Sequence, residues 1–476
     1  MSFEDPRANQ VAPQPLVRRP ISSWMRVLFG RDTAPLTRFE RFILISMVAT
    51  VGMERIDFLG GTGSFRLTPF LIVAPFGLII ALMRGVPRYL LSRKAPTRLR
   101  LGSVLLLAFL VVAVISSVTS ISVVGSLRRT ALLGIVALAM WAFVGTARKF
   151  DNADLIRIGA VVGLIFFIIF DAAQWISHAS GYRAAMGAGG FLDLGTQPFG
   201  NTLIRLSGGL LDANRATPVV AAYVYLLLAD PWVRKKFTSR WASCALLALG
   251  VVLAVGTLSR SGGVMFVMVA IGALRAIFPR LKLRTLSAWI AGCVAIVTAA
   301  VVGTIALAPK SLIAAVFNSR FNLFTDGSAL SHFGLYQKGF EILNSHPAVL
   351  LHGIGWGNTY LYLKNALGAT YFGTAHGTDY YTMFHSAYLT VVVETGVAGL
   401  LIFLAITITP MFSKRALLAI GVALFGVFYQ ALSDPAYWMV VAMLWLAPYQ
   451  SRAVVEATSA PAATRGTSAN PGLLRE

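Results

Sequence analysis

The chain has 476 residues, of which 57% are hydrophobic and only 13% charged, and a formal net charge of +22. Its mean hydropathy of +0.72 lies far outside the soluble range and indicates a polytopic membrane protein. Because most basic residues fall in short segments between apolar runs, the positive-inside rule explains the charge, and we expect no nucleic-acid partner. Cys244 and Cys293 both lie inside apolar runs, which indicates small core residues rather than a disulfide.

Apolar runs of about 20 residues, the length that crosses the hydrocarbon core, recur along the chain. They predict an all-α membrane fold with about 12 transmembrane helices, within a transmembrane domain at 37–449. The expected spans are 37–53, 67–83, 101–119, 130–147, 158–177, 212–229, 241–258, 262–277, 286–308, 386–409, 416–430 and 436–449. Residues 1–36 lack the apolar core of a signal peptide, and we expect them to form an N-terminal tail. Residues 450–476, rich in Ala, Ser, Thr and Pro, predict a disordered tail.

Basic residues gather in every second connection between these spans, for example at 84–100 and 275–284. The positive-inside rule therefore places those connections and both tails in the cytoplasm. The complementary connections lie outside, including a large loop at 309–384 before the last three helices. Few cations remain on this outer side, and those worth naming are Arg183, Arg205, Arg215, Arg260 and Arg320. Each of them either snorkels or pairs within the bundle, or it marks a site.

Arg260 lies in TLSRSGG, between two apolar runs that only a few residues separate. So tight a hairpin forces this Arg to lie at the membrane edge or inside the helix bundle. An Arg in either place is costly and usually marks a functional site or an ion pair. We therefore expect Arg260 to matter more for function than the cytoplasmic Arg residues.

Within the large loop, SHFGLYQKGFEILNSHP carries Phe333, Tyr336, Phe340 and Leu343 at helical spacing. This spacing predicts an amphipathic helix that either lies on the membrane surface or packs on the helix bundle. The next segment, HGIGWGN, surrounds Trp356 with glycines. A flexible turn beside an aromatic ring suits a sugar or a lipid head group, and it equally suits a buried Trp in a tight turn.

The segment HSAYLTVVVETGVAGLLIFL closes the large loop with His385 and opens a membrane helix. A His in this position either anchors the helix end at the interface or performs chemistry at the bilayer surface. An imidazole with a pKa near neutrality suits a general base, which makes His385 the first candidate and His376 the second. Glu394 lies about two and a half helical turns further on, beyond direct contact in a straight helix, and we expect a structural role for it.

Four segments, taken in order, resemble the O-antigen ligase and polymerase superfamily of bacterial membrane proteins. The first is RLSGGLLDANRAT (205–217), and the second is the Ser–Arg of TLSRSGG (257–263). The third is the Arg320 region leading to SHPAVLLHGIGWGN (345–358). The fourth is His385–Ser386, followed after nine residues by Gly396–Val397–Ala398–Gly399.

The resemblance implies a glycosyltransferase of the large membrane class called GT-C, in the bacterial inner membrane, with both termini cytoplasmic and the active site periplasmic. Its donor would be a glycan on undecaprenyl pyrophosphate. A ligase of this family passes the glycan to lipid A–core, and a polymerase passes it to another lipid-linked repeat unit of O-antigen or exopolysaccharide. Leu400 stands where ligases often have Thr or Val, which favours a polymerase. No cofactor is implied, and membrane lipids would be the remaining partners.

The family chemistry suggests roles for the outward residues. Guanidinium groups would stabilise the leaving pyrophosphate bidentately, and an imidazole would deprotonate the acceptor hydroxyl, without a metal ion. Catalytic roles are expected for His385, Arg260 and Arg205. Substrate-binding roles are expected for Arg215, Arg320, Asn214, Trp356 and His376.

Two other functions compete with this interpretation. A polysaccharide flippase or transporter would show charged residues along its helices and no large structured loop, whereas few charged residues, such as Asp171, lie inside the expected spans. A metal-dependent glycosyltransferase could use Glu54 and Asp57, whose carboxylates lie close enough in sequence to share one divalent ion. We expect these two carboxylates to pair with Arg55 or Arg66 instead.

Overall fold

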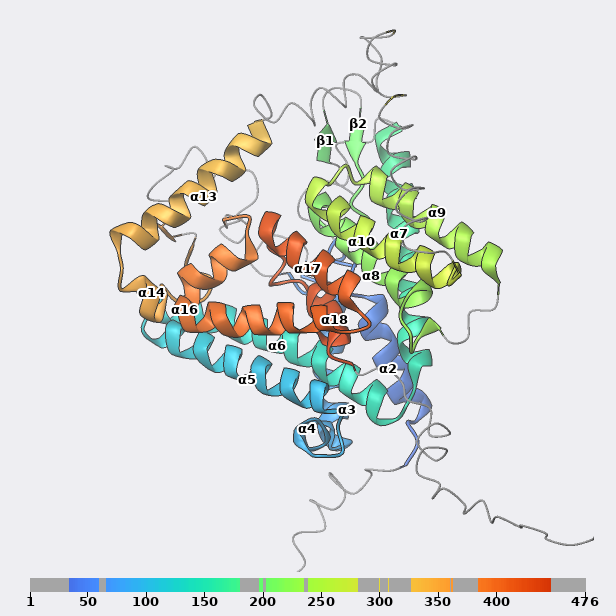
Figure 1. Ribbon diagram of the computed structural model, residues 1–476, viewed down its shortest axis with the longest axis horizontal. Coiled ribbons are helices and arrows are strands. Elements are labelled where there is room, and N and C mark those ends of the chain that lie inside the picture. The colour runs from blue at the N-terminus through green and yellow to red at the C-terminus, as the bar shows by residue number, and fades with distance from the viewer. Residues whose placement is uncertain are drawn as a thin grey trace, which may run out of the picture.

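The computed structural model describes residues 34–59, 66–179, 197–199, 203–234, 239–280, 299, 307, 327–359, 361–362 and 384–446. The helices before the large loop are α2 (Arg38–Ala49), α3 (Pro69–Met83), α4 (Val86–Leu91), α5 (Thr97–Val118), α6 (Val123–Lys149), α7 (Ala153–Ala179), α8 (Ala213–Leu228), α9 (Arg240–Gly256) and α10 (Arg260–Ile277). From the large loop onward they are α13 (Gly327–Ser345), α14 (Val349–His352), α16 (Ala387–Ile408), the 3-10 helix η2 (Thr409–Phe412), α17 (Ala416–Phe428) and α18 (Pro435–Leu444). Helices α5, α6 and α16 lie side by side, and α10 packs against both α8 and α17 (Figure 1).

Helices overlap every expected span except the ninth, 286–308, which lies outside the described residues apart from 299 and 307. Within the described part of the chain, five helical segments are long and apolar enough to cross a membrane. They are α5, α6, α7, α10 and the continuous stretch Ala387–Phe412. The prediction of a helical membrane protein is confirmed, while the number of spans stays a prediction.

A short ribbon departs from the all-α fold that the sequence predicts. Strands β1 (Gln197–Phe199) and β2 (Leu203–Arg205) pair antiparallel, with Gln197 opposite Arg205. Strands of three residues are too short for the alternation of apolar and polar residues that reveals a strand in a sequence. The ribbon matters because Arg205, a predicted catalytic residue, is its last residue.

Many helices begin at a side chain that accepts a hydrogen bond from the first helical turn. These N-caps are Thr37, Thr68, Asp212, Ser239, Ser259 and Ser386. A helix start leaves four backbone N–H groups without partners, and Ser, Thr and Asp satisfy one of them. Three of these caps, at the starts of α8, α10 and α16, lie in the segments that carry the family resemblance.

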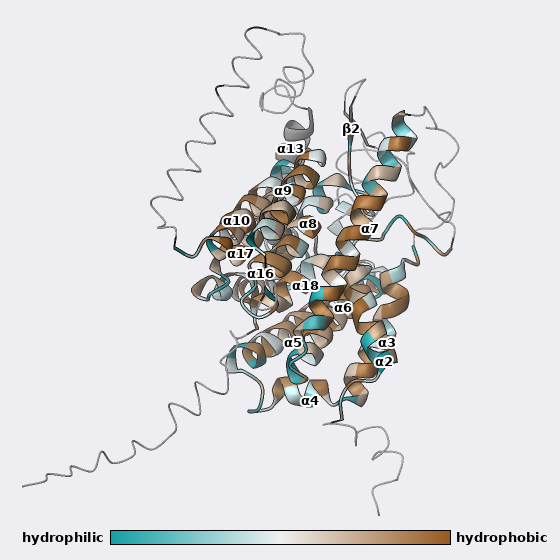
Figure 2. Cartoon of the chain, turned by 90° about the vertical axis from the view of Figure 1, so that its right-hand side faces the viewer, coloured by the Kyte–Doolittle hydropathy of each residue, from teal (hydrophilic) through white to brown (hydrophobic). Residues whose placement is uncertain are grey.

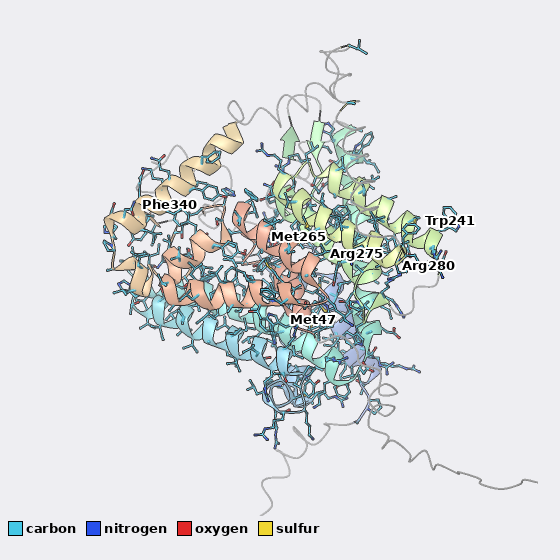
Figure 3. The ribbon with its side chains drawn as sticks, viewed as in Figure 1. Met47, Trp241, Met265, Arg275, Arg280 and Phe340 are labelled. Atoms are coloured by element: carbon cyan, nitrogen blue, oxygen red, sulfur yellow. The ribbon has the colours of Figure 1, made fainter. Side chains whose placement is uncertain are left out.

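Helices α8 and α18 form the centre of the bundle, since residues 215–228 and 435–444 are all buried. Outer helices instead expose apolar side chains, such as Ile169 on α7, which is 54% exposed. Figure 2 shows this hydrophobic surface along α7. Met47 and Met265 lie inside the bundle, whereas Trp241 of α9 points away from it (Figure 3). Apolar side chains on both the inner and the outer faces are expected of helices that lie in lipid.

Two buried ion pairs involve basic residues of the connections that the sequence analysis expects in the cytoplasm. Arg84 donates to Glu40 through Nε at 2.8 Å, which joins α2 to the end of α3. Arg415 donates to Asp230 through Nε at 2.8 Å, which joins the end of α8 to the start of α17. Both guanidinium groups are almost fully buried. A buried charge is tolerated only when paired, so these two basic residues hold helices together.

Helix α13 of the large loop confirms the predicted helix, but only part of its predicted apolar face packs on the bundle. Leu335 is buried and Gly339 touches α16 so closely that a Cβ there would lie 2.7 Å from Leu389. Phe333 and Phe340 are 65% and 57% exposed. The helix therefore packs on the bundle, and two of the four apolar residues that predicted it face outward, as Figure 3 shows for Phe340.

Candidate active site

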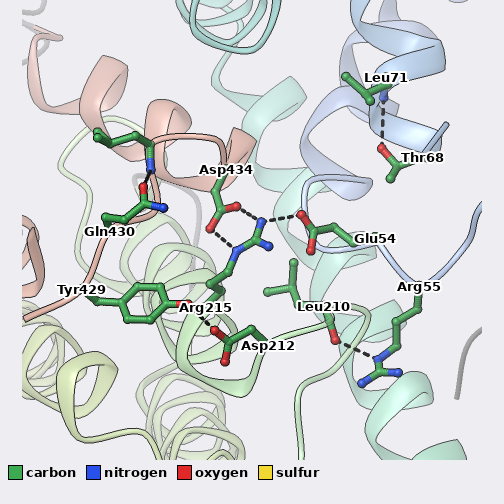
Figure 4. Close-up of polar contacts among 11 residues, drawn as sticks. Glu54, Arg55, Thr68, Leu71, Leu210, Asp212, Arg215, Tyr429, Gln430 and Asp434 are labelled. Carbon is green, nitrogen blue, oxygen red and sulfur yellow. Dashed lines mark hydrogen bonds and ion pairs between the residues drawn. The ribbon is translucent and has the colours of Figure 1, made fainter. Parts of the chain in front are cut away.

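Several of the predicted site residues meet at the first turn of α8. Asp212 is the N-cap of this helix, and its Oδ1 accepts the backbone N–H of Asn214 at 2.8 Å. We call residues 212–215 the α8 start. Because an aspartate cap fixes the conformation of the first turn, it also fixes the directions in which the side chains of that turn leave the helix. Figure 4 shows two other groups of contacts at this turn, the one between Asp212 and Tyr429 and those of Arg215 with Asp434 and Glu54.

Arg205 joins the α8 start to the turn between α9 and α10. Its Nη2 donates to Oδ1 of Asn214 at 2.7 Å, and its Nε donates to the carbonyl of Thr257 at 3.0 Å. The backbone N–H of Leu206 donates to the carbonyl of Gly256 at 3.0 Å, so the chain after β2 follows the same turn. One guanidinium thus holds together two of the segments that resemble the family.

Arg260 is the first residue of α10, directly after that turn, and its side chain is exposed. Ser259 caps the helix by accepting the backbone N–H of Gly262 at 3.1 Å. The hydroxyl oxygens of Thr217 and Thr257 are 2.6 Å apart, and a Cβ on Gly262 would lie 2.5 Å from Cβ of Thr217. The start of α10 therefore lies directly against α8, and the exposed Arg260 is at the edge of this contact.

Arg215 is buried between two carboxylates. Its Nε donates to Oδ2 of Asp434 at 2.6 Å, and its Nη2 pairs with both Asp434 and Glu54 (Figure 4). The side chain is only 5% exposed. These ion pairs tie the segment after α2 and the start of α18 to the α8 start. Since the two carboxylates already offset its charge, a phosphate could reach Arg215 only by exchanging with one of them.

The two carboxylates considered for a metal ion have other contacts. Glu54 pairs with Arg215, while Oδ1 of Asp57 accepts the backbone N–H groups of Leu59 and Leu67, each at 3.0 Å. Among the residues that the structure describes, no group of three or more His, Cys, Asp or Glu side chains could hold a metal ion.

His385 reaches the α8 start through Tyr429, which directly follows α17. The two ring centroids are 5.4 Å apart, and the Tyr429 hydroxyl donates to Oδ2 of Asp212. The His385 carbonyl accepts the hydroxyl of Tyr336 from α13 at 3.1 Å. Burial raises the pKa of Tyr336, so this hydroxyl keeps its proton and remains a donor. His385 itself is half-buried.

His385 and Leu258 share an unusual backbone conformation. Each has a φ of +52°, in the left-handed region that L residues rarely adopt, and each directly precedes a Ser N-cap. A non-glycine residue in this region costs on the order of 1–3 kcal/mol and persists only where its surroundings impose it. The two turns that carry His385 and Arg260 are therefore both strained, which is typical of functional sites.

Polar side chains of α7 and of the segment after α2 bind the loop between β2 and α8. The backbone N–H of Gly208 donates to Oδ1 of Asp171 at 2.7 Å, and Nε2 of Gln174 donates to the carbonyl of Gly208 at 2.8 Å. Nη2 of Arg55 donates to the hydroxyl of Ser207 at 2.7 Å. Asp171, an acidic residue inside an expected span, thus supports the loop that carries Arg205.

Trp356 packs inside the helix bundle. Its ring lies edge-on to Phe109 of α5, with centroids 5.9 Å apart, and is 7% exposed. Its carbonyl accepts the hydroxyl of Ser126, and the next carbonyl, of Gly357, accepts Nη1 of Arg129 at 2.7 Å. These contacts match the buried-Trp alternative of the sequence analysis rather than a residue presented to a sugar.

Glu394 fixes the same segment to α16. Its Oε1 accepts the hydroxyl of Thr359 at 2.7 Å, and its carbonyl accepts the backbone N–H of Gly355 at 3.1 Å. Two residues after it, Gly396 breaks the helix with a φ of +73°. A Cβ on Gly396 would lie 2.7 Å from the carbonyl oxygen of Leu351. The contacts agree with the structural role expected for Glu394.

Some predicted residues cannot be placed against these groups. Arg320 and His376, both expected to bind substrate, lie outside the described residues, as do Arg183 and Cys293.

Sequence reasoning did not single out Asp434, Tyr429 or Asp212, each of which contacts a predicted site residue. One signal was available. An acidic residue on the outer side, immediately before Pro435 at a helix start, is a natural partner for an outward Arg. Which Arg it would meet depends on which helices are neighbours, and periodicity does not reveal that.

The break in α16 generates a prediction about stability. Gly396→Ala should lower the free energy of unfolding by about 1–3 kcal/mol, because Ala is strained at a φ of +73° and its Cβ would meet a backbone carbonyl. The thermal midpoint of the protein in detergent measures this effect. Gly134→Ala is the matched control, since a Cβ on Gly134 in α6 meets nothing within 4 Å. An unchanged midpoint for Gly396→Ala would show that the break is not required.

Comparison with protein families adds a finding that is independent of this geometry. A family model described as O-antigen ligase matches residues 244–404. This segment contains Arg260 and His385, whereas Arg205, Asn214 and Arg215 precede it. No curated protein matches the chain. Residues 244–404, about a third of the chain, are therefore similar to the O-antigen ligase family, and the last three of the four resembling segments lie inside this match.

Proposed function

We propose that the chain is a membrane glycosyltransferase that moves a glycan from undecaprenyl pyrophosphate to an acceptor sugar at the periplasmic face of the inner membrane. The match of residues 244–404 to the O-antigen ligase family model and the apolar helices support an enzyme of this general type in a membrane. The observation that carries the finer proposal is the meeting of separate segments at the α8 start. Arg205 contacts it directly, the turn before Arg260 contacts it through Arg205, and His385 contacts it through Tyr429.

These residues suit the chemistry of the transfer. The acceptor hydroxyl attacks the anomeric carbon, the bond from that carbon to the pyrophosphate oxygen breaks, and the hydroxyl proton passes to the base. We assign the base to His385, because imidazole exchanges protons near neutral pH. Arg205 and Arg260 stabilise the charge that develops on the leaving pyrophosphate, for which a guanidinium is well matched in shape and charge.

The other predicted residues have smaller parts in this proposal. Asn214 orients Arg205 through their hydrogen bond. Arg215 holds the acidic side chains of Asp434 and Glu54 at the α8 start, and it binds phosphate only on exchange with one of them. Arg320 and His376 remain expected substrate-binding residues of the large loop.

The acceptor is proposed to be a second lipid-linked repeat unit, which makes the protein a polymerase. The support is Leu400, where ligases often have Thr or Val. An assay with purified protein in detergent and an undecaprenyl pyrophosphate-linked repeat unit tests this. A ladder of longer lipid-linked glycans is expected. Transfer that requires lipid A–core would identify a ligase, and no transfer to either acceptor would refute the glycosyltransferase.

His385→Ala should lower kcat by about 100-fold or more, because it removes the general base while leaving the helix cap Ser386 in place. The rate of glycan transfer at saturating donor measures this loss. His352→Ala is the control, since His352 is exposed at the end of α14. Wild-type activity of His385→Ala would mean that the residue only anchors the helix end.

Arg260→Lys should lower kcat about tenfold or more, because Lys keeps the charge but loses the planar fork that binds phosphate oxygens in pairs. Arg275→Lys, in the last turn of the same helix, should leave the rate unchanged. Equal activities of the two variants would show that Arg260 acts only through its charge.

The reaction is proposed to need no metal ion, since guanidinium groups take the place of a divalent cation at the leaving pyrophosphate. Transfer by purified protein should therefore continue in excess EDTA. If chelation stops turnover and magnesium or manganese restores it, the Arg-based mechanism is wrong. Glu54 and Asp57 would then be the first residues to replace.

A further inference from the structure

Tyr429 is in contact with both halves of the proposed site. It is 6% exposed, and its ring lies beside the His385 imidazole with a tilt of 51° between the two planes. On its other side the ring meets Phe425, with centroids 5.6 Å apart. The hydroxyl at the tip of the ring donates to Asp212 (Figure 4). One side chain of the segment between α17 and α18 therefore spans from the end of the large loop to the α8 start.

Asp212 uses its two carboxylate oxygens for different partners. Oδ1 accepts the backbone N–H of Asn214, which caps α8, and Oδ2 accepts the Tyr429 hydroxyl. Asn214 in turn accepts Nη2 of Arg205. A continuous series of contacts thus runs from His385 through Tyr429, Asp212 and Asn214 to Arg205.

We infer that Tyr429 and Asp212 are positioning residues, which fix the position and orientation of the His385 imidazole relative to Arg205. The inference rests on the proposed function, in which His385 takes the acceptor proton and Arg205 stabilises the leaving group. A base must lie within hydrogen-bond reach of the proton it removes, and a displacement of about 1 Å can cost on the order of 100-fold in rate. His385 and Arg205 belong to different segments, so their separation depends on whatever connects those segments.

The conformation of His385 supports this role. Its left-handed backbone is held on one side by the hydroxyl of Tyr336 and on the other by the cap at Ser386. These contacts fix the backbone but leave the direction of the imidazole to its side-chain neighbours. Tyr429 is such a neighbour, and its hydroxyl donates to the carboxylate of Asp212. Hydrogen bonds to a carboxylate are stronger than those between neutral groups, so this contact fixes the position of Tyr429.

Two substitutions separate this role from packing and capping. Tyr429→Phe keeps the ring beside His385 and removes only the hydroxyl. Asp212→Ser keeps an N-cap of similar quality but is too short to reach Tyr429. Each should lower kcat about tenfold with KM nearly unchanged. The double variant should be no slower than either single one, since both remove the same hydrogen bond.

Tyr223→Phe is the matched control for the loss of a buried tyrosine hydroxyl. The Tyr223 hydroxyl donates to the carbonyl of Val48 at 2.9 Å, inside the bundle. This variant should lower the thermal midpoint without changing kcat. If Tyr429→Phe and Asp212→Ser both keep the wild-type kcat, the inference is wrong, whatever their thermal midpoints. The contact between Tyr429 and Asp212 would then serve only packing and stability.

A second readout does not depend on turnover. Diethylpyrocarbonate modifies imidazoles at a rate set by their exposure and surroundings, and peptide mass spectrometry reports each His separately. Tyr429→Phe and Asp212→Ser should both speed the labelling of His385, with His352 unchanged as an internal control. If the wild-type protein transfers no glycan but the labelling of His385 still changes in the two variants, the proposed function is wrong. Tyr429 and Asp212 would nevertheless position His385. If the wild-type enzyme is active and both variants match it in kcat and labelling, the inference alone fails.

Discussion

The arrangement of the site depends on the pairing of one buried guanidinium. Arg215 lies where α8 enters the bundle, and an unpaired charge in such a place costs several kcal/mol. Asp434 and Glu54 meet this requirement from two other parts of the chain. The pairing therefore decides more than the stability of one side chain, because it brings the segment after α2 and the start of α18 to the first turn of α8.

The same first turn then organises the residues that suit glycan transfer. Asp212 and Asn214 belong to the same turn as Arg215. Asp212 accepts a hydrogen bond from Tyr429, after α17, and Asn214 accepts one from Arg205, at the end of β2. Because α8 is buried along almost its whole length, packing holds its start in place together with these polar contacts. Several loops contact this rigid helix end. A site supported by a rigid element keeps its geometry, so the α8 start is suited to hold these residues in place.

Much of the fold could be predicted from the sequence because the membrane limits the alternatives. A run of apolar residues in lipid has to form a helix, so the spans follow from length and hydropathy alone. The order of the motifs likewise pointed to Arg205, Arg260 and His385. The β1–β2 ribbon could not be predicted, since strands of three residues carry no periodic signal. The partners Asp434 and Tyr429 could not be predicted either, because hydropathy does not say which helices are neighbours. Trp356 shows the remaining ambiguity, since glycines around a Trp fit a binding turn and a buried turn equally well.

Backbone strain gives a reason why the motifs contain the residues they do. Leu258 and His385 stand in the left-handed region just before the caps of α10 and α16, and Gly396 breaks α16 further along. Each deviation redirects the chain at a place where a regular helix would continue straight. At Gly396 the redirection makes room for the backbone of Leu351, which lets the large loop dock on the helix that begins beside His385. A regular α16 would keep its hydrogen bonds but would exclude that loop, so the local cost of the break is offset by the contacts of Glu394 with Gly355 and Thr359.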